Sequence, residues 1–189
     1  LVDLAEGKKL LPDPPIASIG YQASIVITPQ QEADMDIKAT LNNLLIPYTS
    51  NYAGTLLPGI REYTVTPGEK TTTISGKGKA GLKQEENYYF FYLPVCYKGI
   101  TGKSYAYYNT SRSKNLYLPA SVDENYSYDI QLPENLTLCT PIQEKKIDNP
   151  IGSFKITLTS EGSSLHIELA LQIKKQLITP AEYPAFRSL

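Results

Sequence analysis

The sequence predicts an all-β fold, an antiparallel β-sandwich that is immunoglobulin-like or larger, and three observations support this class. Apolar and polar residues alternate with period two along much of the chain, most clearly at 126–132, 154–159 and 165–174. Residues typical of turns separate these runs at short intervals. No run of useful length has helical periodicity before residue 179. Because successive side chains of a strand point to opposite faces, each alternating run is typical of a strand with one buried face.

The chain has 189 residues, and we expect one β-sandwich domain over 16–178. Residues 1–15 contain three prolines, which favour extended backbone, so they are interpreted as a linker or edge segment. The first two strands are expected near 21–27 and 35–41, where apolar side chains occupy every second position. In the segment 160–164, Gly162 can supply a positive φ, which predicts a hairpin between the last two strands.

The least expected feature of the composition is a block of aromatic residues at 88–108, in a chain with 15 tyrosines and no tryptophan. Its continuous apolar character favours a strand buried on both faces. The alternative is a contact surface for a glycan or for protein, because tyrosine combines apolar area with a hydroxyl group. The candidate residues for this surface are Tyr88, Tyr89, Tyr92, Tyr97, Tyr105, Tyr107 and Tyr108. The segment just before the block, 76–87, is rich in glycine and charge and is interpreted as a loop.

A helix is expected to start at the end of the chain, over 179–189. Thr179 is a good N-cap, Pro180 suits the first helical position, and Glu182 follows three residues after the cap. Pro184 fits this register poorly because it lacks a backbone N–H. The chain then stops, so we interpret 179–189 as a truncated helix start.

Catalysis by a thiol would require an imidazole within hydrogen-bond reach. His166 is the only histidine, and its place in the alternating run predicts that it points outward. The only cysteines are Cys96 and Cys139, both in segments that resemble strands. They are interpreted either as a disulfide or as two buried thiols, and a catalytic pair is not expected.

The charge pattern argues against several other classes of function. The net charge is −1, so no basic surface for nucleic acid or for an anionic membrane is expected, and the apolar runs are too short to span a bilayer. Glu32, Asp34 and Asp36 supply carboxylates without the spacing of a calcium loop, so we interpret them as a solvated strand face. We therefore expect no metal and no cofactor.

Several segments resemble the closing domain of exported bacterial transglutaminase-like proteins. The resemblance is carried by LPENLTL (132–138), IGSFKITLTSEGSSLHIELALQI (151–173) and ITPAEYPAFRSL (178–189), and 11–28 and 111–130 are compatible with it. In that family an N-terminal β domain precedes a transglutaminase core, and a second β domain ends the chain. The resemblance implies a non-catalytic domain that contacts the catalytic core and other domains of its protein, in the periplasm or outside the cell. The Cys–His–Asp triad of the core is in none of the matched segments.

Overall fold

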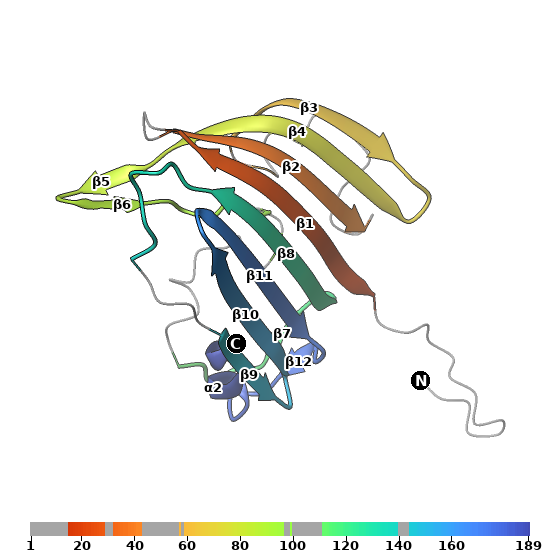
Figure 1. The fold of residues 1–189 in the computed structure, drawn as a ribbon. Coiled ribbons are helices and arrows are strands. Elements are labelled where there is room, and N and C mark those ends of the chain that lie inside the picture. The colour runs from red at the N-terminus through yellow and green to blue at the C-terminus, as the bar shows by residue number, and fades with distance from the viewer. Residues whose placement is uncertain are drawn as a thin grey trace, which may run out of the picture.

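One large sheet of eight strands dominates the computed structural model, which describes residues 15–28, 32–42, 57, 59–96, 99, 111–139 and 144–189. Its strands lie in the order β3-β4-β2-β1-β8-β11-β10-β9 (Figure 1). Two small sheets, β12-β7 and β5-β6, and one short helix complete the described elements. The elements are β1 (Ile16–Ile27), β2 (Glu32–Asn42), β3 (Ile60–Pro67), β4 (Thr71–Gly81), β5 (Lys83–Glu85), β6 (Tyr88–Phe90), β7 (Leu116–Tyr117), β8 (Ser121–Gln131), β9 (Glu144–Asn149), β10 (Gly152–Glu161), β11 (Ser164–Ile173), β12 (Leu177–Ile178) and α2 (Tyr183–Ser188).

The prediction of an all-β fold is confirmed, but the large sheet is mixed rather than purely antiparallel. β1 and β8 pair in parallel at the centre of the sheet, and every other pair within it is antiparallel. This pairing divides the sheet into an N-terminal half, β3-β4-β2-β1, and a C-terminal half, β8-β11-β10-β9. Parallel neighbours need a long connection, and the whole segment between β1 and β8 serves as one here.

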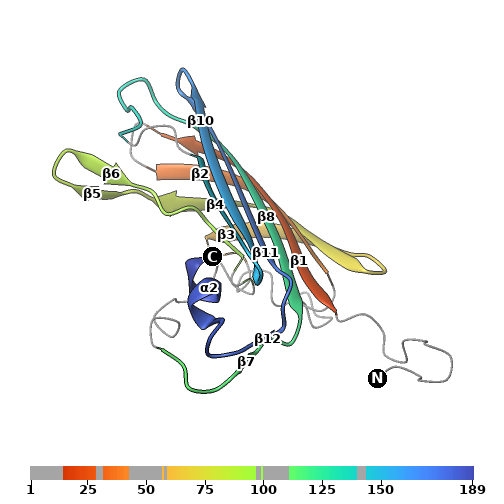
Figure 2. The ribbon, with the colours of Figure 1, turned by 90° about the horizontal axis from the view of Figure 1, so that it is seen from below.

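The two faces of the large sheet differ in polarity. On one face, the apolar side chains of the central strands form a buried core that includes Tyr21, Ile37, Tyr128 and Ile167. On the other face, the alternate residues of the same strands are polar and mostly exposed. In Figure 2, α2, β7 and β12 all lie on one side of the sheet. The arrangement is consistent with an all-β sandwich in which the second layer is small.

The helix at the end of the chain forms a second, smaller core with the sheet. Tyr183 and Phe186 of α2 are buried with Ile151, Ile173 and other apolar residues. The predicted helix exists, but it begins at Tyr183 rather than directly after Thr179. The later start places Pro184 in the first turn, where its missing N–H costs no helical hydrogen bond.

Two segments differ from their sequence interpretation. Most of 76–87, expected to be a loop, is strand: residues 76–81 form the second half of β4 and residues 83–85 form β5. Gly76 and Gly78 are required because the neighbouring backbone passes very close, and a Cβ on Gly76 would lie 2.2 Å from the carbonyl oxygen of Glu62 on β3. The strand β9 was not predicted, because Ile147 is its only apolar residue.

The predicted hairpin at 160–164 is confirmed, with Gly162 at φ 58° and Glu161 paired with Ser164. The linker at 1–15 lies almost entirely outside the described residues. No helix in the described part of the chain has both the length and the apolar character needed to cross a membrane.

Candidate interaction surface

The hairpin β5–β6 extends the line of β4 and projects beyond the end of the large sheet (Figures 1 and 2). Its strands are three residues long and pair Lys83 with Phe90 and Glu85 with Tyr88. Glu86 turns the chain with φ 54°. The prediction of a strand buried on both faces is therefore wrong for the described part of 88–108, because β6 ends at Phe90 and two of its three residues are exposed.

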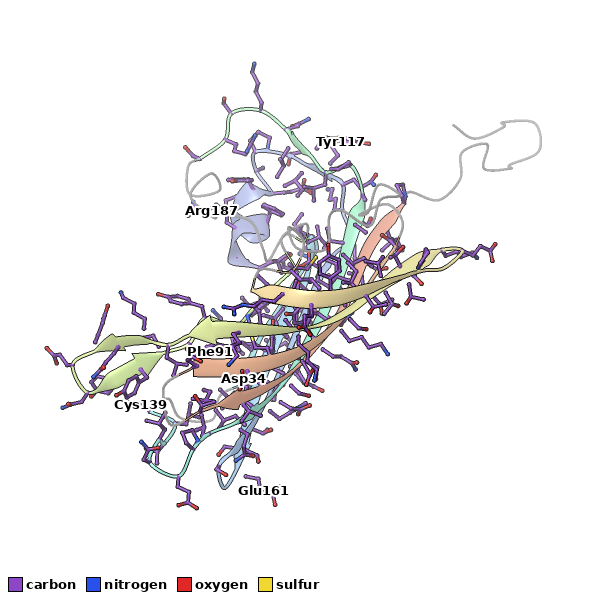
Figure 3. The ribbon with its side chains drawn as sticks, turned by 90° about the horizontal axis from the view of Figure 1, so that it is seen from above. Asp34, Phe91, Tyr117, Cys139, Glu161 and Arg187 are labelled. Atoms are coloured by element: carbon purple, nitrogen blue, oxygen red, sulfur yellow. The ribbon has the colours of Figure 1, made fainter. Side chains whose placement is uncertain are left out.

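Tyr88 and Phe90 lie on one side of β6, and Tyr92 is exposed two residues after the strand; we define these three residues as the aromatic row. Tyr88 is 53% exposed, Phe90 is 44% exposed, and Tyr92 is 77% exposed. The alternate residues are half-buried, and two of them, Phe91 and Leu93, pack against the main core. Figure 3 labels Phe91 close to the large sheet. The segment is therefore anchored on one side and presents apolar rings to solvent on the other.

Three of the predicted candidates lie within the described residues, and two of these belong to the exposed surface. Tyr88 and Tyr92 belong to the aromatic row, whereas Tyr89 lies on the opposite, half-buried side of the hairpin. Tyr97, Tyr105, Tyr107 and Tyr108 lie outside the described residues. Phe90 was missed because the sequence interpretation considered only tyrosines. The segment YYFFYL (88–93) has no alternation of polarity, so its sequence does not mark Phe90 as exposed.

Buried tyrosines hold the segment that follows the aromatic row. The hydroxyl of Tyr128 donates a hydrogen bond of 2.8 Å to the carbonyl oxygen of Pro94. Beside it, the hydroxyl of Tyr126 donates to the Glu124 carboxylate at 3.0 Å, and Gly99 lies close enough that a Cβ there would meet the same carboxylate at 2.7 Å. Burial raises the pKa of Tyr128, so this hydroxyl keeps its proton and its donor role at high pH.

The two cysteines lie in different environments, and no disulfide joins them. Cys96 is completely buried in the main core, at the end of the segment held by Tyr128. Cys139 is exposed. The alternative of a disulfide is therefore not realised in this structure, and of the two thiols only Cys96 is buried as expected.

His166 lies on the polar face of the sheet, as its place in the alternating pattern predicts. Its Nδ1 is 2.7 Å from Oδ1 of Asp129, and its Nε2 is 3.3 Å from Oε1 of Glu168. These hydrogen bonds, first that of Asp129 and then that of Glu168, raise the pKa of the imidazole. A shallow groove of about 680 Å³ runs beside the ring and is lined both by hydroxyl groups such as that of Ser24 and by apolar side chains such as that of Val26.

This arrangement leaves His166 poorly suited to activate a thiol. Both ring nitrogens are engaged by carboxylates, which favour the charged imidazolium over the neutral base. Cys96 lies in the core beneath the opposite face of the sheet. The single histidine and the buried cysteine are therefore separated by the sheet itself.

Two of the three acidic residues of β2, Glu32 and Asp34, form ion pairs on the polar face. Nζ of Lys79 on β4 lies 3.1 Å from Asp34 and 3.6 Å from Glu32. Asp34, on β2, is labelled in Figure 3. Within the described ranges, no group of three or more His, Cys, Asp or Glu side chains is arranged to hold a metal ion.

Comparison with known proteins places most of this structure in one family. Residues 87–189, more than half of the chain, match the family described as Domain of Unknown Function with solved-structure structure (DUF3858). The chain belongs to the DUF3858 family. The matched DUF3858 segment starts at the turn of the β5–β6 hairpin and includes the aromatic row, the C-terminal half of the sheet and α2.

One similar solved structure is that of a candidate protease from Parabacteroides distasonis ATCC 8503, with 32% sequence identity and a TM-score of 0.46. The match covers 51% of this chain and only 19% of that one. The DUF3858 chain therefore spans a minor part of the length of this neighbour. No curated protein matches the chain.

Proposed function

We propose that this DUF3858 chain is a non-catalytic accessory β domain of an exported, periplasmic or extracellular, transglutaminase-like protein. In this proposal the domain contacts the catalytic core of that protein, stabilises it and helps to shape access to its active site. The observation that carries the proposal is the aromatic row on a hairpin that projects from the sheet. The choice of partner is supported by the motifs at 132–138, 151–173 and 178–189, which resemble the closing domain of such proteins.

The physical argument begins with the hairpin itself. A two-stranded hairpin is marginally stable in water unless it packs against something else. Here Phe91 and Leu93, directly after β6, pack against the main core, while the aromatic row remains in solvent. Each aromatic side chain that becomes buried in an interface removes ~150–250 Å² from solvent, and such residues dominate the energetics of protein interfaces. A partner that covered the row would therefore gain a compact apolar anchor.

The chemistry of the described residues favours a supporting role over a catalytic one. His166 is held between two carboxylates, and Cys96 is buried on the other side of the sheet. A thiol nucleophile needs a nearby base to generate its thiolate. In the proposal, catalysis belongs to the core, and this domain supplies contact surface.

The test is to measure binding of the chain to the transglutaminase-like core encoded in the same open reading frame. Replacing Tyr88, Phe90 and Tyr92 together by Ser should abolish the binding, or the thermal stabilisation of the core, seen with the wild-type chain. Tyr117→Ser is the matched control, because Tyr117 is a 67% exposed tyrosine on β7, outside the row. Absence of binding, or binding that the triple substitution leaves unchanged, would refute the proposal.

A second candidate function is an independent glycan-binding or protein-binding module, favoured by the exposure of the Tyr92 ring. A glycan array on the wild-type chain and on the same triple variant separates the two functions. A glycan signal that is lost in the triple variant, together with no binding to the core, would replace the accessory role with this one.

A further inference from the structure

The edge strand β9 ends the large sheet opposite β3, and its charges follow a self-complementary order (Figure 1). Lys146 and Asp148 point to the polar face, where they stand opposite Lys155 and Ser153 of β10. Ile147, between them, points to the apolar face opposite Phe154. We propose that β9 pairs antiparallel with β9 of a second copy of the chain, about a two-fold axis through Ile147.

The charges on this edge support the pairing. Lys146 is a direct cross-strand neighbour of Lys155, and like charges in that position are destabilising. Nζ of Lys155 is already engaged by Glu144 at 3.2 Å. In the part of the chain that the structure describes, neither Lys146 nor Asp148 takes part in an ion pair. A two-fold pairing about Ile147 places Lys146 opposite the partner's Asp148 and Asp148 opposite the partner's Lys146.

The register follows from the side chains. Cross-strand pairs must join residues on the same face of the sheet, so the register can shift only in steps of two residues. A shift in one direction brings Lys146 opposite the partner's Lys146, and a shift in the other brings Asp148 opposite the partner's Asp148. Pairing about Ile147 avoids both repulsions. It is also isologous, as a two-fold dimer requires.

The apolar face supplies a second observation. Near this edge, Ile147, Phe154 and Ile156 are only half-buried. Pairing about Ile147 brings it against the partner's Ile147 and continues the apolar row across the seam. Asn149 donates a hydrogen bond of 2.9 Å to the carbonyl oxygen of Ala185, so α2 lies at the end of β9. Lys145, Lys146 and Asp148 remain exposed.

The experiment measures self-association of the 189-residue chain by sedimentation across a wide concentration range. We expect a monomer–dimer equilibrium that high salt weakens. Lys146→Asp alone and Asp148→Lys alone each turn two attractive pairs into repulsive ones and should weaken dimerisation about tenfold or more. The double variant Lys146→Asp/Asp148→Lys restores both pairs and should return to within about threefold of the wild type. A chain that is monomeric throughout, or a double variant as weak as either single one, would overturn the proposal.

A crosslink tests the register separately. In a Cys139→Ser background, Ile147→Cys places two thiols at directly opposed positions, close enough for a disulfide between copies under mild oxidation. The matched control is Lys145→Cys, because the two copies of residue 145 would lie about 13 Å apart along paired strands. Equal crosslinking of the two variants, or none with Ile147→Cys, would contradict the register. Circular dichroism of each variant establishes that it is folded.

Discussion

Two buried tyrosines of the main core, Tyr21 and Tyr128, should respond in opposite ways to loss of the hydroxyl group. Tyr21 and Tyr128 are both about 1–2% exposed, and their ring centroids lie 5.8 Å apart. The Tyr128 hydroxyl donates to the carbonyl of Pro94, whereas the Tyr21 hydroxyl has no hydrogen-bond partner among the described residues. Replacement by Phe removes one oxygen from each site and keeps the ring, so packing changes little.

The magnitudes follow from these partners. Tyr128→Phe loses a hydrogen bond and leaves a half-buried carbonyl without its donor, which should lower the free energy of unfolding by ~1–2 kcal/mol. For a chain of this size that corresponds to a fall in Tm of roughly 2–8 °C. Tyr21→Phe removes a buried hydroxyl that makes no bond, so we expect a change between zero and ~1 kcal/mol of stabilisation.

Urea unfolding followed by circular dichroism measures both effects. The comparison requires that the free energy of unfolding falls with urea at the same slope in the wild type and in the two variants. Hydrogen exchange adds a local readout, because Tyr128→Phe should speed exchange in 91–96 and Tyr21→Phe should not. If Tyr21→Phe destabilised the protein as much as Tyr128→Phe, the assignment of the two hydroxyls would be wrong.

Two further predictions concern pH. His166 is the only histidine, so NMR titration reports its pKa directly, and we expect a value above the ordinary 6.5 that falls more with Asp129→Asn than with Glu168→Gln. Because folding raises this pKa, protonated His166 stabilises the folded state fully below pH 6.5, and this contribution is lost as pH rises through the pKa of the folded state. If the two substitutions lowered the pKa equally, Asp129 would not be its main cause. The pKa of Glu182 is lowered from 4.5 to about 2 by hydrogen bonds from Lys175 and from the backbone and hydroxyl of Thr179. Its stabilisation should therefore be present above pH 4.5 and lost as pH falls toward 2, and acid titration of Glu182→Gln should lack this loss.

The sequence predicted the strands that are buried on one side. Period-two alternation identified the central parts of β1, β2, β8, β10 and β11, because each has one face in the core and one in solvent. The pattern does not encode which strands become neighbours. The parallel pairing of β1 with β8 joins segments on either side of a long connection, and it depends on how the two halves of the sheet meet.

The segments that the sequence did not predict correctly also have physical explanations. β9 is an edge strand with charged residues on both faces, so it lacks the alternation that marks a half-buried strand. The second half of β4 contains Gly76 and Gly78, which suggest a loop in the sequence but allow close approach of β3 in the structure. The aromatic block was expected to be buried because of its density of apolar residues. Every residue from Tyr88 to Leu93 is aromatic or apolar, so the alternation of exposed and half-buried side chains in the structure has no counterpart in the sequence.

The two proposed contacts use opposite flanks of the molecule and should therefore be independent. The aromatic row follows β4, next to the β3 edge, whereas β9 forms the other edge of the eight-stranded sheet. Substitutions at sites this far apart, with no shared partners, normally have additive effects. Lys146→Asp should thus leave affinity for the catalytic core within about twofold of the wild type, and the Ser triple variant of the aromatic row should leave the dimerisation constant equally unchanged. Isothermal titration of each variant against the core, paired with sedimentation of the free chains, measures both constants. Loss of both contacts in either variant would mean that the two surfaces are coupled, or that one of them has been assigned to the wrong part of the sheet.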